Sequence, residues 1–220
     1  MRDDYTHITV LLDRTGSMEA IRDDVIGGFN AFLEEQKREP GQATLTLVQF
    51  DTQDPYEVLH HFAPLQEIPA LTRETYVPRA ATPLLDALGR GINELEHSLA
   101  VIPEAVRPSK VVFVVITDGQ ENSSREFRKE QIVKMIREKQ EKDGWQFVFL
   151  SADLEAIEDA MGYGFHAASS MAFDKTESGV GDAFASLSAR LADYRGARAS
   201  EVAFHEEDRQ RQEGERRRRR

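Results

Sequence analysis

The sequence predicts a doubly wound α/β fold, in which a mostly parallel sheet of six strands with one antiparallel edge strand carries helices on both faces. Apolar runs alternate with amphipathic helical patterns along almost the whole chain, as expected when crossover helices join parallel strands. The central runs are also continuously apolar, which is typical of strands buried on both faces. With 220 residues, we expect one domain over 5–195 and a charged tail over 196–220.

The first half of the chain supplies three of the predicted strands. "HITVLL", residues 7–12, is a buried strand, and a helix follows from about Glu19 until just before "EPG". Gly28 lies in the apolar stripe of this helix, where we expect close packing on the sheet. The runs 43–50 and 56–62 are joined by "DTQDP", which is too short for a parallel crossover. They should form a hairpin whose second strand is the antiparallel edge.

The second half continues the alternation after a loop over 63–82. Pro83 is favourable in the first turn of the next helix, and Asp86 should stabilise the amino end of that helix through the helix dipole. Ser123 and Glu126 form a capping-box pattern, which predicts a helix from there to about Lys142. The other predicted elements are a central strand at 110–117, a strand at 145–152, a helix from Leu154, a short strand near 168–173 and a last helix that includes Phe184 and Tyr194.

Composition narrows the classes of function. Without cysteine, the chain has neither disulfides nor thiolate metal sites, which fits a cytoplasmic protein. The first residues, "MRDDYTH", do not resemble a secretory signal, and no apolar run reaches the roughly 18 residues of a membrane span. The tail has 8 Arg and 6 acidic residues, so the preceding part carries a net charge of −13. Such a body should repel nucleic acid and anionic membranes, and the tail should be disordered or partly helical.

Oxygen-bearing side chains follow two of the predicted strands. Asp13, Thr15 and Ser17 come directly after the first strand, and Asp118 follows the fourth. In a doubly wound sheet the strand order commonly reverses beside the first strand, so these side chains should converge on one crevice. Carboxylates and hydroxyls suit hard cations such as Mg²⁺ or Mn²⁺, and neutral hydroxyls would leave the cation enough charge to attract one more anionic oxygen.

Structural explanations exist for the same residues. The stretch from Asp13 to Ser17 could be an Asx or Ser/Thr turn that caps the next helix. Thr82 could cap the helix that Pro83 opens. Glu121 and Asn122, just beyond Asp118, could tune the rim of a site or be solvated loop residues.

The pattern resembles the von Willebrand factor A (vWA) domain, whose metal-ion-dependent adhesion site (MIDAS) has the form D-x-S-x-S, then a distant Thr and a distant Asp. Thr15 replaces the middle Ser, and "RAATPLLDAL" resembles the Thr loop of the family. "DRTGSM" and "TDGQEN" are similar to bacterial intracellular members. The resemblance covers about residues 5–195 and implies a divalent cation, Mg²⁺ or else Mn²⁺ or Ca²⁺. The implied metal-site residues are Asp13, Thr15, Ser17, Thr82 and Asp118.

The resemblance further implies a protein-binding module that is not an enzyme, in which the cation binds an Asp or Glu of a partner protein. Family members of this type work with partner ATPases or in stress-response assemblies. One alternative is a Mg²⁺-dependent hydrolase or phosphatase, although Thr15 stands where an aspartyl phosphatase has its acid. Another is an RNA-associated scaffold that works through the arginine tail.

Overall fold

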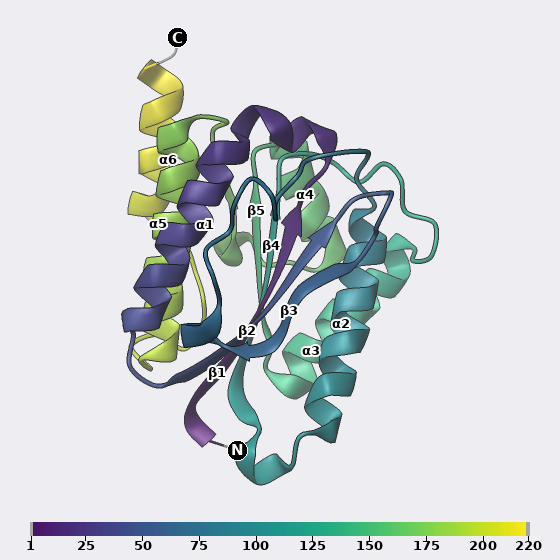
Figure 1. The fold of residues 1–220 in the computed structure, drawn as a ribbon, viewed down its shortest axis with the longest axis vertical. Coiled ribbons are helices and arrows are strands. Elements are labelled where there is room, and N and C mark those ends of the chain that lie inside the picture. The colour runs from purple at the N-terminus through teal and green to yellow at the C-terminus, as the bar shows by residue number, and fades with distance from the viewer. Residues whose placement is uncertain (1, 219–220) are drawn as a thin grey trace.

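The computed structural model describes residues 2–218, and side chains over 4–213, as one sheet between two layers of helices (Figure 1). The strands are β1 (Arg2–Asp13), β2 (Gln42–Phe50), β3 (Glu57–Pro64), β4 (Pro108–Thr117), β5 (Gln146–Ser151) and β6 (Ser170–Ala172). The α-helices are α1 (Arg22–Arg38), α2 (Leu84–Val101), α3 (Lys129–Asp143), α4 (Leu154–Tyr163), α5 (Glu177–Arg195) and α6 (Glu206–Arg218). Short 3₁₀ turns are η1 (Gly16–Ile21), η2 (Leu65–Glu67), η3 (Glu104–Val106) and η4 (Ala167–Ser169). No helix within the described residues combines the length and apolar character needed to cross a membrane.

The strand order is β3-β2-β1-β4-β5-β6, which confirms the predicted doubly wound sheet. β1 pairs in parallel with both β2 and β4, so the order reverses beside β1. β2 and β3 pair antiparallel, as the short "DTQDP" connection predicts. The chain therefore leaves the centre of the sheet in opposite directions on the two sides of β1, and the carboxyl ends of β1 and β4 lie where a doubly wound fold usually binds its ligand.

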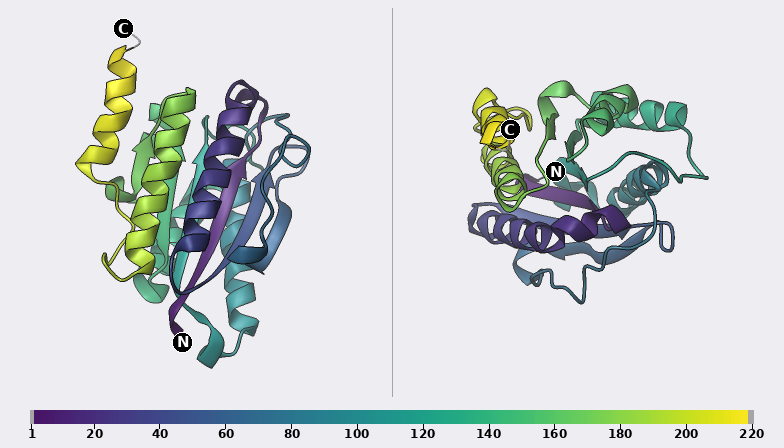
Figure 2. Two further views of the ribbon diagram at one scale, coloured as in Figure 1. Left: turned by 60° about the vertical axis from the view of Figure 1, so that its left-hand side comes forward. Right: turned by 90° about the horizontal axis from the view of Figure 1, so that it is seen from above.

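Helices cover both faces of the sheet, as the two views of Figure 2 show, and an apolar cluster of buried side chains lies under each layer of helices. Alternate β1 residues Ile8, Val10 and Leu12 pack on the side of α1 and α5. Leu11 lies in the other cluster, with α2, α3 and α4. This alternation buries the central strands on both faces, which explains their continuous apolar runs in the sequence, whereas the edge strand β3 is partly exposed.

The capping-box prediction at Ser123 and Glu126 is wrong, because α3 begins only at Lys129. The carboxylate of Asp86 accepts the backbone N–H groups of Arg125, Glu126 and Phe127 at 2.8–2.9 Å. Those N–H groups thereby gain a partner outside any helix, and the segment stays a loop. Asp86 lies in the first turn of α2, as expected, and its carboxylate additionally binds this loop.

The expectation that Gly28 allows close packing on the sheet is also wrong. A Cβ at this position would overlap the ring of Phe184 on α5, so Gly28 allows α1 to approach α5 and not the sheet. The first turn after β1 also differs from an α-helix, because η1 precedes α1.

Part of the charged tail packs against the domain. Val202 and Phe204 are buried in the same apolar cluster as α1 and α5, so this part of the tail contributes to the core. α6 then lies beside α5 (Figure 2). Asp208, fully buried, pairs with Arg190 of α5 at 3.3 Å, and its other oxygen accepts a hydrogen bond from Arg211.

Candidate metal site

The candidate site lies at the carboxyl ends of β1 and β4, toward the upper end of the sheet in Figure 1. Leu12 of β1 is in register with Ile116 of β4, so the chain leaves both strands at the same level. Asp13 ends β1, and Asp118 directly follows Thr117, the last residue of β4. Residues about a hundred positions apart in sequence are thus neighbours, as the switch-point argument predicts.

Asp13 is fully buried, and both of its carboxylate oxygens accept hydrogen bonds. Oδ1 accepts the backbone N–H of Thr15 at 2.7 Å, and Oδ2 accepts the hydroxyl of Thr117 at 2.6 Å. Burial raises the pKa of Asp13 to about 7, although these hydrogen bonds oppose the rise, and the nearby charge of Asp118 adds to it. A buried carboxylate of this kind gains from a cation beside it.

Hydroxyl groups connect the two carboxylate-bearing strands. Thr15 Oγ1 and Ser17 Oγ are 3.3 Å apart, and Ser17 Oγ donates to Asp118 Oδ1 at 2.6 Å. Thr15 and Asp118 are buried, whereas Ser17 is exposed. The structure therefore brings Asp13, Thr15, Ser17 and Asp118 into one hydrogen-bonded group that reaches solvent at Ser17.

Thr82 is connected to this group through the backbone of its loop. The carbonyl of Ala80 accepts the N–H of Gly16 at 3.0 Å. Thr82 itself accepts the N–H of Asn122 at 3.2 Å and donates its own N–H to the Asn122 side chain at 3.0 Å. Thr82 does not cap α2, because the N-cap is Pro83 and has no side-chain hydrogen bond. Its buried place between the segments after β1 and β4 leaves it as a candidate ligand.

Glu121 and Asn122 are structural residues of the rim. The carboxylate of Glu121 accepts the backbone N–H groups of Ser123, Ser124 and Leu85, so it closes its own turn and caps the first turn of α2. Together with Asn122, it fixes the Thr82 loop to the segment after Asp118. They are not simply solvated loop residues.

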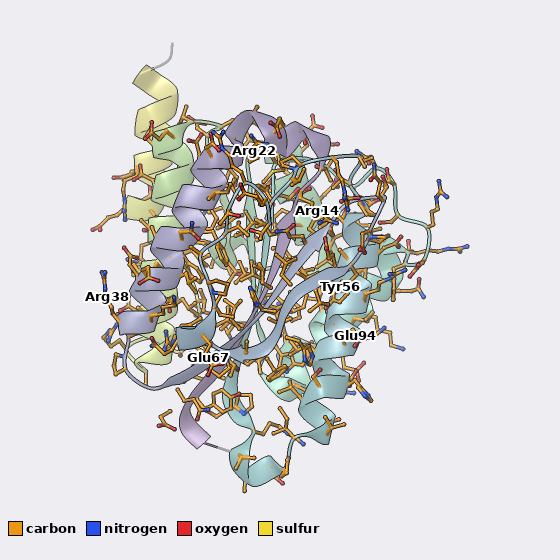
Figure 3. The ribbon with its side chains drawn as sticks, viewed as in Figure 1. Arg14, Arg22, Arg38, Tyr56, Glu67 and Glu94 are labelled. Carbon is orange, nitrogen blue, oxygen red and sulfur yellow. The ribbon has the colours of Figure 1, made fainter. Side chains whose placement is uncertain are left out.

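Sequence reasoning missed the charged residues that support the site from the hairpin side. Arg14 is buried and lies toward the end of the molecule where α1 begins (Figure 3). Its Nε donates to Asp51 Oδ2 at 2.6 Å, and Arg79 donates to the same oxygen at 2.9 Å. Burial opposes ionisation of Asp51, but hydrogen bonds from Arg79, two backbone N–H groups and Arg14 lower its pKa. Asp51 thereby ties the residue after Asp13 to the loop that carries Thr82.

Lys175 is a further residue that sequence reasoning missed. It lies between β6 and α5, and its Nζ is 2.7 Å from Asp118 Oδ2. Its position just after the last strand places it at the same edge of the sheet, which is the signal that could have revealed it.

The donor set fits a hard cation. Two carboxylates and three hydroxyls are oxygen ligands of the kind that Mg²⁺, Mn²⁺ and Ca²⁺ bind, and the ammonium of Lys175 already lies against one of the carboxylates. No cluster of three or more His, Cys, Asp or Glu side chains suited to a metal occurs in the described part of the chain. The candidate site differs from such a cluster because three of its five proposed donors are hydroxyls.

No known sequence family matches the chain, and no curated protein matches it either. Solved structures do. One is a von Willebrand factor type A protein from Catenulispora acidiphila, with 11% identity, a TM-score of 0.56, and coverage of 85% of this chain and 42% of that one. The manganese-loaded TRAP protein of Plasmodium vivax has 15% identity and a TM-score of 0.55, with coverage of 80% and 70%.

A third similar structure is proximal thread matrix protein 1 of the mussel byssus, solved with a zinc-occupied MIDAS motif. It has 14% identity and a TM-score of 0.54, with coverage of 88% of this chain and 46% of that one. The chain thus spans less than half the length of the first and third of these proteins. The shared feature is the fold: this chain has the fold of a vWA domain.

Proposed function

We propose that this chain is a metal-dependent protein-binding module. A divalent cation would be held by Asp13, Thr15, Ser17, Thr82 and Asp118 and would bind an Asp or Glu carboxylate of a partner protein. The observation that carries the proposal is the hydrogen-bonded oxygen group at the β1–β4 crevice, which reaches solvent at Ser17. The likeness in fold to manganese-loaded and zinc-occupied structures supports a divalent cation in general.

The balance of donors supports an anionic partner. Hydroxyls carry no charge, so coordination by two carboxylates and three hydroxyls would leave the cation strongly electrophilic. It would therefore attract one further anionic oxygen. Ser17 is exposed whereas the other members of this group are buried, which supports the approach of a partner from that side. Mg²⁺ is the first candidate because oxygen ligands suit it and it is bound with water retained, with Mn²⁺ or Ca²⁺ as alternatives.

A binding role fits Asp13 better than catalysis does. In the phosphatase alternative, Asp13 would be the nucleophile, but it is fully buried and both of its oxygens accept hydrogen bonds. A hydrolase would be indicated instead by Mg²⁺-dependent turnover of a phosphate ester that D13N abolishes. An RNA-binding role of the arginine tail would be indicated by RNA binding that falls steeply with salt and is lost when residues 214–220 are deleted.

The wider setting of the module is proposed from the resemblance alone. In this proposal the chain is a bacterial cytoplasmic protein, and its partner is an ATPase or a component of a stress-response assembly. Any such partner should present a carboxylate at its contact surface.

The test measures Mn²⁺ and Mg²⁺ binding to the full chain by isothermal titration calorimetry. S17A should weaken binding at least about tenfold, and D118N should weaken it further, because each removes a donor from the site. S200A, which changes an exposed serine outside the site, is the matched control and should bind as the wild type does. A crystal soaked with Mn²⁺ and acetate should place the acetate on the cation at the Ser17 side. Equal metal affinity in S17A, D118N and S200A would refute the proposal.

A further inference from the structure

Lys175 occupies one side of a carboxylate that the proposed cation needs. Its Nζ lies 2.7 Å from Asp118 Oδ2, while Ser17 donates to Oδ1 of the same carboxylate at 2.6 Å. The Asp118 side chain is fully buried, and that of Lys175 is 41% exposed. The ammonium therefore reaches in from the rim, and solvent lies on its outer side.

The backbone around Lys175 is fixed on both sides. Phe173 donates its N–H to the carbonyl of Ser151 at 2.9 Å, which anchors the turn to β5. Thr176 caps α5 by accepting the N–H of Gly179 at 2.9 Å. Lys175 thus stands between an anchored strand end and a capped helix, and its stem starts from a defined place.

α6 holds the same turn from outside. Gln212, buried on α6, accepts the N–H of Asp174 at 3.1 Å and donates to the carbonyl of Gly179 at 2.8 Å. Its amide therefore bridges the two ends of the segment that contains Lys175. Arg209, one turn earlier, donates to the carbonyl of Ser170 at 2.9 Å and fixes α6 beside β6.

We propose that Lys175 is a built-in competitor of the divalent cation at Asp118 and that Gln212 of α6 positions it there. An ammonium and a divalent cation at one carboxylate repel each other, so cation binding must displace Lys175 or weaken its ion pair. α6 opposes this displacement because it fixes the turn. The charged tail thereby tunes the metal affinity of a site whose proposed ligands all precede residue 119. This inference rests on the proposed function.

The experiment measures Mn²⁺ affinity of the full chain by titration calorimetry in wild type, K175M, Q212A and the double variant. K175M should bind Mn²⁺ roughly fivefold more tightly, the upper end for an ion pair with one exposed partner. K134M removes an equal charge from an exposed lysine of α3 and should match the wild type. Q212A should shift affinity in the same direction by a smaller factor. The double variant should equal K175M, because Gln212 acts through Lys175.

Thermal unfolding in EDTA verifies that each variant is folded, and K175Q replaces K175M if that variant is not. Wild-type affinity in K175M refutes the inference and leaves the proposed function standing. A Q212A effect that persists in the K175M background refutes the role of α6. If no form of the chain binds Mn²⁺, the proposed function fails, and the competitor role fails with it.

Discussion

His7 makes the stability of the fold sensitive to mild acid. The ring is fully buried in β1, with Nδ1 2.9 Å from the hydroxyl of Thr44 and Nε2 3.2 Å from that of Thr9. It stacks on Phe62 with ring centroids 3.6 Å apart. Burial, with a smaller contribution from the nearby charge of His61, lowers the pKa of His7 to about 3.

The sign and size of the effect follow from this pKa. An unfolded histidine binds a proton near pH 6.5, whereas His7 in the folded chain does so only near 3. The unfolded state therefore takes up the proton first, and the free energy of unfolding decreases as the pH falls below 6.5. Between pH 7 and pH 5, His7 alone should remove about 2 kcal/mol, and the loss should continue toward pH 3.

The assay is urea unfolding at several pH values between 5 and 7.5, in EDTA, for wild type and H7Q. Asp13, whose raised pKa acts in the opposite direction, is present in both proteins and cancels in the comparison. Wild type should lose about 2 kcal/mol more than H7Q over this range. H97Q, at an exposed position of α2, should follow the wild type. Parallel curves for wild type and H7Q would show that His7 does not stay neutral in the folded chain.

Two further predictions test local packing by the same unfolding measurement. G27A should stabilise the chain by up to about 1 kcal/mol, because Gly27 has open space around it, whereas G28A should destabilise it by roughly 1–3 kcal/mol through overlap with Phe184. The reverse order for the two glycines would contradict the packing of α1 on α5. D86A should cost about 3 kcal/mol and make the loop 119–128 more sensitive to protease, because three N–H groups lose a charged acceptor, while E94A on the exposed side of α2 should do neither. A D86A protein as stable as E94A would remove that explanation for the late start of α3.

Sequence patterns predicted most of the fold because the strands and the hairpin depend mainly on residues close together in the sequence. The central strands are apolar enough to be buried on both faces, and "DTQDP" leaves no room for a crossover, so sheet and hairpin follow from neighbouring residues. The start of α3 could not be predicted in this way. The capping-box pattern at Ser123 and Glu126 competes with a carboxylate 39 to 41 positions away, and that carboxylate takes the backbone N–H groups. Tertiary contacts outweighed a pattern of four residues.

In the candidate site, too, some contacts could be predicted from the sequence and others could not. The first strand end and the fourth could be predicted to meet, because fold topology alone brings Asp13, Ser17 and Asp118 together. The ion pair between Lys175 and Asp118 joins residues 57 positions apart and depends on where one turn is anchored. The hydrogen bond that Asp174 donates to Gln212 depends on a segment whose composition predicts disorder. The buried side chains of Val202 and Phe204 hold that segment to the core. Composition describes the average of a whole segment, so it does not reveal that a few buried side chains fix the segment to the core.

Lys175 also bears on why the partner should be anionic. With both carboxylates ionised, Asp13, Asp118 and Lys175 sum to one negative charge, and a divalent cation would change the sum to one positive charge. One carboxylate from a partner would then neutralise the site while the ammonium stays within reach. Without the ammonium, the same site would already be neutral after cation binding, and its attraction for a carboxylate would be weaker. K175M should therefore bind the cation more tightly and a carboxylate ligand less tightly. A variant that disrupted the fold of the site would weaken both, so the opposite signs separate electrostatic competition from a loss of structure.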